Sequence, residues 1–255
     1  MASATQQATN RALPANNYLP PTTRAGTVNL SLLAGMLYLT IILSGACGEL
    51  LIRTLLVDTT SSLLTLENIQ TNIGLFKLIF VLNTLMVLCD ITLAVLLYYL
   101  LTPYSPILAT LSLVFRLCQA FILCINLLEY YSPALLLDSS LATVMSKPQI
   151  AGKVELNFSM YSYGYDFALI FFSLSNLFLG MAILKTKWFS SVISYGLWLA
   201  AAVYMFGSIS RFIEPNLAES TSSLYLIPFV AEAAFCACLL STIRNKQGDK
   251  DDYQK

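Results

Sequence analysis

Residues 78–128 read LIFVLNTLMVLCDITLAVLLYYLLTPYSPILATLSLVFRLCQAFILCINLL, and this stretch decides the fold. It contains two apolar runs, Leu78–Leu101 and Ile107–Leu128. Each run is long enough to cross a bilayer as an α-helix, which needs about 20 apolar residues. The connection between them is short and contains two prolines, so it allows only a tight turn. The stretch therefore predicts a pair of antiparallel membrane-spanning helices.

Each arm of this predicted hairpin carries one ionisable residue near its middle. Asp90 lies 13 residues before Pro103, and Arg116 lies 13 residues after it. Equal offsets place the two side chains at one depth, about 20 Å from the turn at 1.5 Å per residue. A lone charge at mid-membrane costs at least ~2.5–3.5 kcal/mol. We therefore expect Asp90 and Arg116 to face each other at the centre of the molecule.

The composition of the whole chain supports a membrane protein. Hydrophobic residues make up 57% of the 255 residues and charged residues only 11%, whereas soluble domains have about 25% charged residues. The net charge is zero, so nothing indicates a nucleic-acid partner. The chain has no histidine, which removes the commonest metal ligand and general base. We expect no metal, no cofactor and no catalytic residue, and an enzyme is disfavoured.

The apolar runs predict an all-α bundle of six transmembrane helices. The expected spans are Val28–Ile52, Leu78–Leu101, Ile107–Leu128, Phe167–Leu184, Phe189–Ser210 and Leu224–Ile243. The expected domain organisation is a disordered tail over 1–27, a membrane domain over 28–243 and a polar tail over 244–255.

The connections on the far side of the membrane are predicted to contain short helices. Residues 58–62 offer several N-cap candidates for a surface helix over Leu63–Gln70. The longest connection is expected over 130–165. Within it, 133–145 and 150–160 are expected to form short helices on the membrane surface or over the bundle.

The distribution of positive charge predicts the orientation. Six spans place both termini on one side of the membrane, and that side carries eight Lys and Arg residues against five on the other. Because cytoplasmic loops are enriched in Lys and Arg, both termini are expected in the cytoplasm.

Further polar residues in the spans are expected to face the interior of the bundle, because they cannot face lipid. Asn83 shares a helix face with Asp90, and Gln119 and Asn126 share one with Arg116. Asp166 and Asn176 share a third face. The predicted network also includes Glu49 near the end of the first span, Arg211 at the end of the fifth and Glu232 in the last. Together they predict a funnel that opens outward and closes on Asp90 and Arg116.

Several short motifs resemble those of an uncharacterised, mainly bacterial family of integral membrane proteins, domain of unknown function 4386. They are Arg24-Ala25-Gly26, residues 34–39, Asp58, Thr65 with Asn68-Ile69, residues 75–77, Asp90, Leu97-Tyr98, residues 115–117, Gln119-Ala120, Asn126, residues 163–166, Phe171-Phe172, Leu179-Gly180 and Ala231-Glu232. The sequence departs from the family at Ser175, near which a His is often found, and at Ala231, where a Gly is usual. The resemblance implies a six-span protein in the inner membrane of a bacterium, and it supplies no activity.

Three hypotheses remain open for the function. The leading one is a membrane scaffold or partner-binding subunit whose buried polar network, centred on Asp90 and Arg116, fixes helix register. The first alternative is a transporter or receptor-like module that binds a small polar ligand, ion or proton in the funnel. The second is a membrane enzyme that uses carboxylate acid–base chemistry, with Glu232 or Asp90, on a lipid-soluble substrate. The expected partners are the lipid bilayer, a small polar ligand or lipid, and a protein partner or second copy of the chain.

Overall fold

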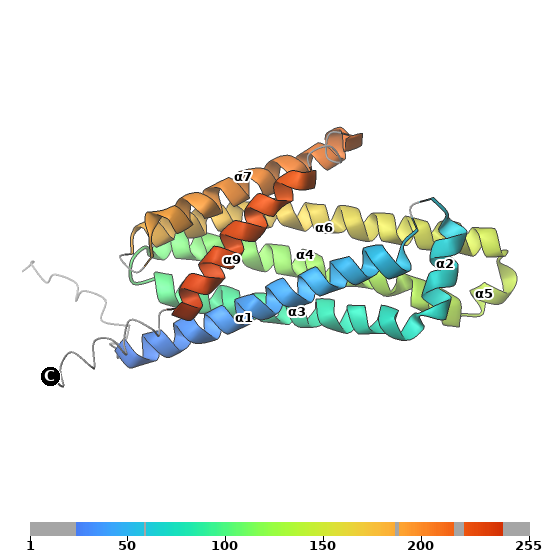
Figure 1. Ribbon diagram of the computed structural model, residues 1–255, viewed down its shortest axis with the longest axis horizontal. Coiled ribbons are helices and arrows are strands. Elements are labelled where there is room, and N and C mark those ends of the chain that lie inside the picture. Colours follow the sequence, from blue (N-terminus) through green and yellow to red (C-terminus); the bar gives the residue numbers. More distant parts are fainter. Residues whose placement is uncertain (1–23, 59, 187–188, 217–221, 242–255) are drawn as a thin grey trace, which may run out of the picture.

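The computed structural model describes residues 24–58, 60–186, 189–216 and 222–241, and these residues form helices without a strand (Figure 1). Six helices are long and apolar enough to cross a membrane. The predicted all-α, six-span fold is therefore confirmed, and the chain is a multi-pass integral membrane protein.

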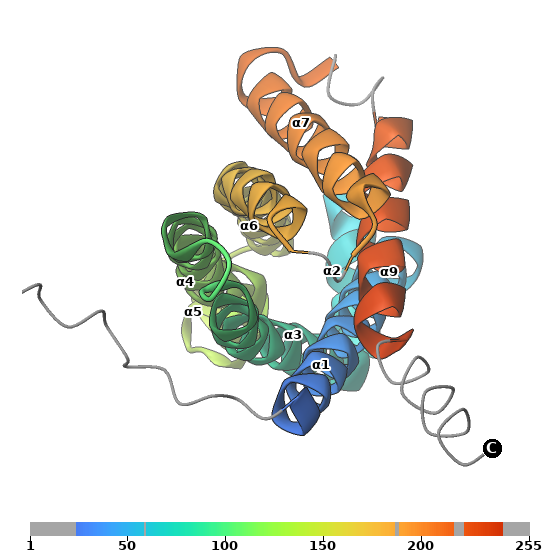
Figure 2. The ribbon, with the colours of Figure 1, turned by 90° about the vertical axis from the view of Figure 1, so that its left-hand side faces the viewer.

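The six long helices surround a common interior. They are α1 (Arg24–Leu51), α3 (Ile73–Leu101), α4 (Pro106–Asp138), α6 (Lys147–Leu184), α7 (Ser191–Ile213) and α9 (Leu226–Ser241). Each packs against the next in this order, and α9 packs back against α1, which closes the ring (Figure 2). α1 begins and α9 ends at the same end of the bundle, as an even number of spans requires (Figure 1).

The contact between α9 and α1 is made through small residues. A side chain at Gly35 would lie 2.8 Å from Leu240, so only glycine allows this approach. Ser31 Oγ donates to the Leu239 carbonyl at 3.2 Å, and Cys236 Sγ donates to the Gly35 carbonyl at 3.4 Å. Small residues at helix interfaces let membrane helices pack closely. They explain why the first and last spans meet.

The short helices lie at the end of the bundle opposite the start of α1 and the end of α9. α1 continues as a π-helical turn, η1 (Ile52–Leu56), which leads to α2 (Ser62–Thr71). Ser61 caps α2 by accepting a hydrogen bond from the Leu64 amide. The surface helix predicted over 63–70 is therefore present. A single turn, α5 (Leu141–Val144), lies at the same end (Figure 1).

The prediction of a long connection over 130–165 was wrong. α4 continues through Pro133 to Asp138, and α6 already begins at Lys147. The extensions of α4 and α6 are stable because they pack with α2 and α3 in one apolar cluster. This cluster contains Leu56, Leu66, Ile69, Phe76, Tyr130, Ala134, Ile150, Ala151 and Val154. The sequence predicted that the third span ends at Leu128, whereas burial in this second core favours continuous helices.

The start of α6 is fixed by local hydrogen bonds. Ser146 and Gln149 form a capping box, in which the Ser146 amide donates to the Gln149 side chain at 2.9 Å. Pro148 lies in the first turn, where its missing N–H costs nothing. A separate apolar cluster fills the opposite end of the bundle, between α1, α3, α4, α6, α7 and α9. The polar residues considered next lie between these two cores.

Candidate functional site

The innermost polar contact joins α3 to α4. Arg116 donates from Nε to Asp90 Oδ1 at 2.8 Å and from Nη2 to the same oxygen at 2.6 Å. The Asp90 side chain is 5% exposed and that of Arg116 is 2% exposed, so this ion pair is buried. With its amide nitrogen turned toward the carboxylate, Gln119 donates to Asp90 Oδ2 at 2.8 Å. The predicted contact between Asp90 and Arg116 is present, and Gln119 completes it.

Aromatic rings enclose the Arg116 guanidinium on two sides. Its Cζ lies 5.4 Å from the centre of the Tyr38 ring and 5.0 Å from that of Phe172. These distances are within the range of cation–π attraction, about 6 Å. The remaining Arg116 nitrogen, Nη1, and the Tyr38 hydroxyl are buried without a hydrogen-bond partner among the described residues.

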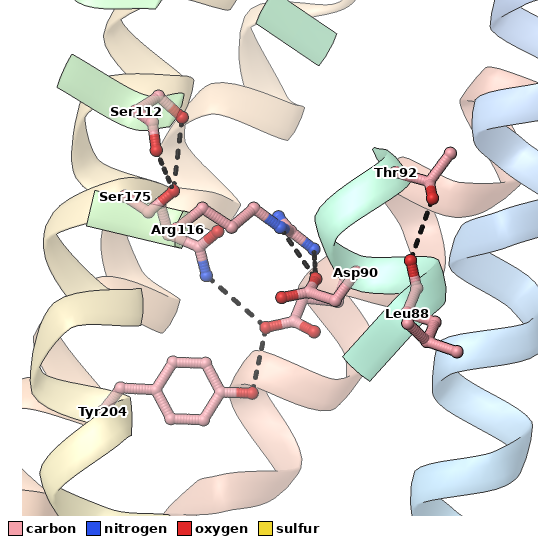
Figure 3. Close-up of polar contacts among 9 residues, drawn as sticks. Leu88, Asp90, Thr92, Ser112, Arg116, Ser175 and Tyr204 are labelled. Atoms are coloured by element: carbon pink, nitrogen blue, oxygen red, sulfur yellow. Dashed lines mark hydrogen bonds and ion pairs between the residues drawn. The ribbon is translucent and has the colours of Figure 1, made fainter. Parts of the chain in front are cut away.

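A second carboxylate, Glu232 of α9, belongs to the same group of side chains. Tyr204 donates its hydroxyl to Glu232 Oε1 at 2.9 Å, and Asn176 donates Nδ2 to the same oxygen at 3.5 Å. The charge of Glu232 acts on Arg116 together with that of Asp90. Figure 3 shows Tyr204, Asp90 and Arg116 directed toward one another from three helices. We call Tyr38, Asp90, Arg116, Gln119, Asn176, Tyr204 and Glu232 the inner cluster.

A cavity of about 750 Å³ lies between this cluster and the end of the bundle that carries α2. Helices α1, α3, α6 and α7 and the turn η2 (Ser222–Tyr225) contribute its walls. The polar lining comprises Glu49, Asn83, Tyr161, Ser162, Tyr163, Tyr165, Asp166, Arg211 and Tyr225. The cavity therefore contains two carboxylates, one guanidinium and four tyrosines.

Asp166 and Arg211 form an ion pair in the cavity wall. Arg211 Nε lies 3.0 Å from Asp166 Oδ2, with the Arg211 side chain 34% exposed and that of Asp166 11% exposed. Arg211 also donates from Nη2 to Ser162 Oγ at 2.8 Å, and its Cζ lies 4.9 Å from the centre of the Tyr163 ring. These contacts join α7 to α6 and hold the guanidinium on one side of the cavity.

Asn83 and Glu49 form part of the opposite wall. Asn83 is buried, and its Nδ2 donates to the Tyr161 hydroxyl at 3.4 Å across the cavity. Gly48 makes room for this amide, because a Cβ there would lie 3.1 Å from Asn83 Oδ1. Glu49 follows Gly48 on α1 and lines the cavity.

The arrangement differs from the predicted single funnel. Glu49, Asn83, Asp166 and Arg211 line the cavity, but neither Asp90 nor Arg116 is among the described residues that line it. Met86 and Leu169 contribute to the lining, and Met86 lies one helical turn before Asp90 on α3. The predicted site residues thus divide into an outer cavity and an inner cluster.

The family can now be compared with this geometry. Residues 33–242 match the family model described as domain of unknown function DUF4386. The chain belongs to the DUF4386 family. No curated protein and no solved structure matches this chain significantly.

One predicted site residue of this DUF4386 protein has a different place. Asn126 lies in the contact between α4 and α6, where it donates Nδ2 to the Tyr161 carbonyl at 2.7 Å. Gly164 opposes it, and any Cβ at Gly164 would overlap the Asn126 amide. Asn126 therefore joins two helices and does not line the cavity.

Sequence reasoning missed the tyrosines of the DUF4386 site. Tyr38, Tyr204 and the cavity residues Tyr161, Tyr165 and Tyr225 were not among the predicted site residues. Tyrosine has an apolar ring, so it fits an ordinary membrane helix as well as a polar site. The available signal was local: Tyr204 lies three residues before Gly207 and seven before Arg211, so it shares a helix face with both.

Proposed function

We propose that this DUF4386 protein binds a small, positively charged organic molecule in the cavity, as a receptor or transport module. The observation that carries the proposal is the cavity itself. Its volume of about 750 Å³ is within the range of about 300–1,000 Å³ that is usual for small-molecule sites. Charged and hydrogen-bonding groups line it on several helices, which supports a ligand-binding role over that of a plain scaffold.

The charges and rings of the lining support a cation as the ligand. Glu49 and Asp166 carry two negative formal charges, against one positive charge on Arg211. The tyrosines add ring faces that attract cations, and recognition of ammonium groups by aromatic side chains with acids is a common solution. A molecule with an amino or quaternary ammonium group fits this combination best.

The inner cluster supports a structural role beside ligand binding. Asp90 accepts hydrogen bonds at both oxygens, from Arg116 and from Gln119. Such a paired network holds helices in register. We therefore assign to Asp90, Arg116 and Gln119 the role of fixing α3 against α4. This role is the part of the scaffold hypothesis that we keep.

The distribution of basic residues supports an orientation with both termini in the cytoplasm. With both termini in the cytoplasm, the end of the bundle that carries α2 and the cavity faces the outside of the cell. A bacterial inner membrane, which the family resemblance implied, would place the cavity toward the periplasm. The ligand would then reach the protein from outside the cell.

A thermal-shift assay on the purified full-length protein tests the proposal. Choline and tetramethylammonium chloride would be compared with sodium chloride at equal ionic strength. An organic cation at 100-fold its Kd stabilises the folded state by about 2.7 kcal/mol. Glu49→Gln should remove this stabilisation.

The matched control is Glu67→Gln. Glu67 lies on the exposed surface of α2, where it pairs with Lys147 and does not line the cavity. This variant should respond to cations as the wild type does. The proposal is wrong if neither cation stabilises the wild type, or if Glu49→Gln retains the full effect.

A further inference from the structure

We propose that Glu232 is a proton-binding site and that its protonation is linked to the charge in the cavity. The proton site depends on the inner cluster alone. Only the link to a bound cation rests on the proposed function. The proton adds to one carboxylate oxygen of Glu232, and ionisation returns it to water.

The first argument is the charge balance of the inner cluster. The inner cluster contains two carboxylates, Asp90 and Glu232, and one cation, Arg116. Arg116 directs two hydrogen bonds to Asp90, whereas the donors recorded for Glu232 are the neutral groups of Tyr204 and Asn176. With both acids ionised, the cluster has an excess negative charge inside a membrane-spanning bundle. A proton on Glu232 removes that charge, which is otherwise expensive at this depth.

The second argument is the Asn176 amide, which can serve both states of Glu232. Asn176 is fully buried, its Nδ2 faces Glu232 Oε1 at 3.5 Å, and its Oδ1 has no hydrogen-bond partner among the described residues. The orientation with Nδ2 toward Glu232 suits an ionised carboxylate. A half-turn of the amide brings Oδ1 toward Glu232, where it accepts the hydrogen of a protonated carboxyl. This rotation of the Asn176 amide breaks no hydrogen bond of Oδ1, because Oδ1 makes none with the described residues in the present orientation.

Groups on every neighbouring helix interact with Glu232. Besides Tyr204 of α7 and Asn176 of α6, they are Tyr38 of α1, Asp90 of α3, Arg116 of α4 and Tyr165 of α6. The Arg116 guanidinium attracts an ionised Glu232 carboxylate, and the Asp90 carboxylate repels it. Glu232 thus lies near both an attracting and a repelling charge, which suits a proton-binding site.

Two tyrosines connect the inner cluster with the cavity. Tyr204, which donates to Glu232, contacts Tyr225 edge to face, with ring centres 5.9 Å apart. Tyr225 lines the cavity, and Gly207 admits it, because a Cβ at Gly207 would lie 2.5 Å from the Tyr225 hydroxyl. The charges of Glu49, Asp166 and Glu232 all act on Tyr165, which also lines the cavity.

The spacing on α7 gives the order of magnitude of the link, because Tyr204 contacts Glu232 and Arg211 lines the cavity. Tyr204 and Arg211 are seven residues apart, which is about 10 Å along a helix. Two unit charges ~10 Å apart at an effective dielectric constant of ~20 change each other's binding by roughly tenfold. Because linkage is reciprocal, a cation in the cavity and a proton on Glu232 should oppose each other by this factor.

Infrared difference spectroscopy of the purified full-length protein in lipid nanodiscs tests both parts. A protonated carboxyl has a C=O stretch that is distinct from that of a carboxylate. The wild type and Glu67→Gln should show such a band that titrates with pH, and Glu232→Gln should lack it. Glu49→Gln removes one negative charge from the cavity without a ligand, so at a given pH it should reduce the ratio of protonated to ionised Glu232 by up to tenfold.

Each outcome decides one part. A band that persists in Glu232→Gln, or no titrating band in the wild type, overturns the proton site. A Glu49→Gln titration identical to that of the wild type overturns the link and leaves the proton site standing. If Glu232→Gln does not fold, Tyr204→Phe replaces it. Loss of the Tyr204 donor must then alter the frequency of the band, and an unchanged band overturns the assignment. None of these readouts depends on whether choline binds.

Discussion

Arg116 places two hydrogen bonds on a single oxygen of Asp90, Oδ1, and leaves the other oxygen to Gln119. The geometry is therefore not the symmetric fork in which each carboxylate oxygen receives one guanidinium nitrogen. Sharing the carboxylate in this way ties α3 to two successive positions on one face of α4. It also leaves Arg116 Nη1 without a partner among the described residues.

Breaking this pair from one side should be far more damaging than replacing it altogether. Asp90→Leu leaves Arg116 buried and unpaired, which should lower the free energy of unfolding by about 3–5 kcal/mol. The double variant Asp90→Leu/Arg116→Met should lose less than Asp90→Leu alone. Chemical denaturation in mixed micelles measures the losses for Asp90→Leu, for Arg116→Met and for the double variant. A double-variant loss equal to the sum of the two single losses would contradict a mainly structural pair.

Gly164 should be the most sensitive glycine of α6. Any Cβ there overlaps the Asn126 amide, which is fixed to the Tyr161 carbonyl. Overpacking of this kind typically costs about 1–3 kcal/mol, so Gly164→Ala should lower the melting temperature.

The control for Gly164 lies in the same helix. Nothing lies within 4 Å of the Cβ position of Gly152. Gly152→Ala should be neutral or stabilising by up to about 1 kcal/mol, because alanine is the better helix former. Equal melting temperatures for Gly152→Ala and Gly164→Ala would show that the Asn126 contact does not restrict Gly164.

The turn before α2 should lose stability in acid. Asp58 Oδ1 accepts hydrogen bonds from the Thr60 hydroxyl at 2.6 Å, the Thr60 amide at 2.8 Å and the Ser61 amide at 2.9 Å. These hydrogen bonds lower the pKa of the Asp58 carboxyl, and the bond from the Thr60 hydroxyl has the largest effect. A lowered folded-state pKa means that the stabilisation is complete above the unfolded value, about 4, and is lost as the pH falls through the folded value.

Hydrogen exchange of residues 60–66 checks this pH dependence. At neutral pH, Asp58→Asn should exchange faster than the wild type in this segment. The difference should shrink below about pH 4, as the wild-type carboxyl becomes protonated. A difference that stays constant into strong acid would mean that the Asp58 charge does not hold the turn.

The ion pairs Asp166–Arg211 and Glu67–Lys147 should contribute differently to the free energy of unfolding, because they differ in burial. Asp166 is 11% exposed and pairs with Arg211, whereas Glu67 is 51% exposed and pairs with Lys147. Asp166→Asn should lower the free energy of unfolding by about 2 kcal/mol, a usual value for a hydrogen bond to a charged group. Glu67→Gln should change it by less than about 1 kcal/mol. Chemical denaturation of both variants under the same conditions measures these two changes. A larger loss of unfolding free energy for Glu67→Gln than for Asp166→Asn would contradict the prediction.

The number of spans, the turn at Pro103 and the depth of Asp90 and Arg116 could all be predicted from sequence. Each follows from a property that acts locally: apolar length matched to bilayer thickness, helical rise and the high cost of a lone charge in lipid. The pairing of Asp90 with Arg116 followed because two neighbouring helices with equal offsets leave little choice of partner.

The continuity of α4 through Pro133 could not be predicted in this way. It depends on Tyr130 and Ala134 meeting Ile150 and Val154 of α6 and residues of α2 in one core. The position of Asn126 against Gly164, and not toward the cavity, likewise depends on how far each helix is rotated about its axis. A helical pattern shows which residues share a face, but not which neighbour that face meets.

The division of the polar residues into an outer cavity and an inner cluster was decided by the same rotations and by the tyrosines. Tyr204 joins Glu232 to Tyr225 only because α7, α9 and η2 pack against one another. Membrane insertion is governed by the apolar content of each segment, and this content can be read directly from the sequence. A binding site is governed by side chains from distant segments at a few ångströms, and those distances exist only in the packed bundle.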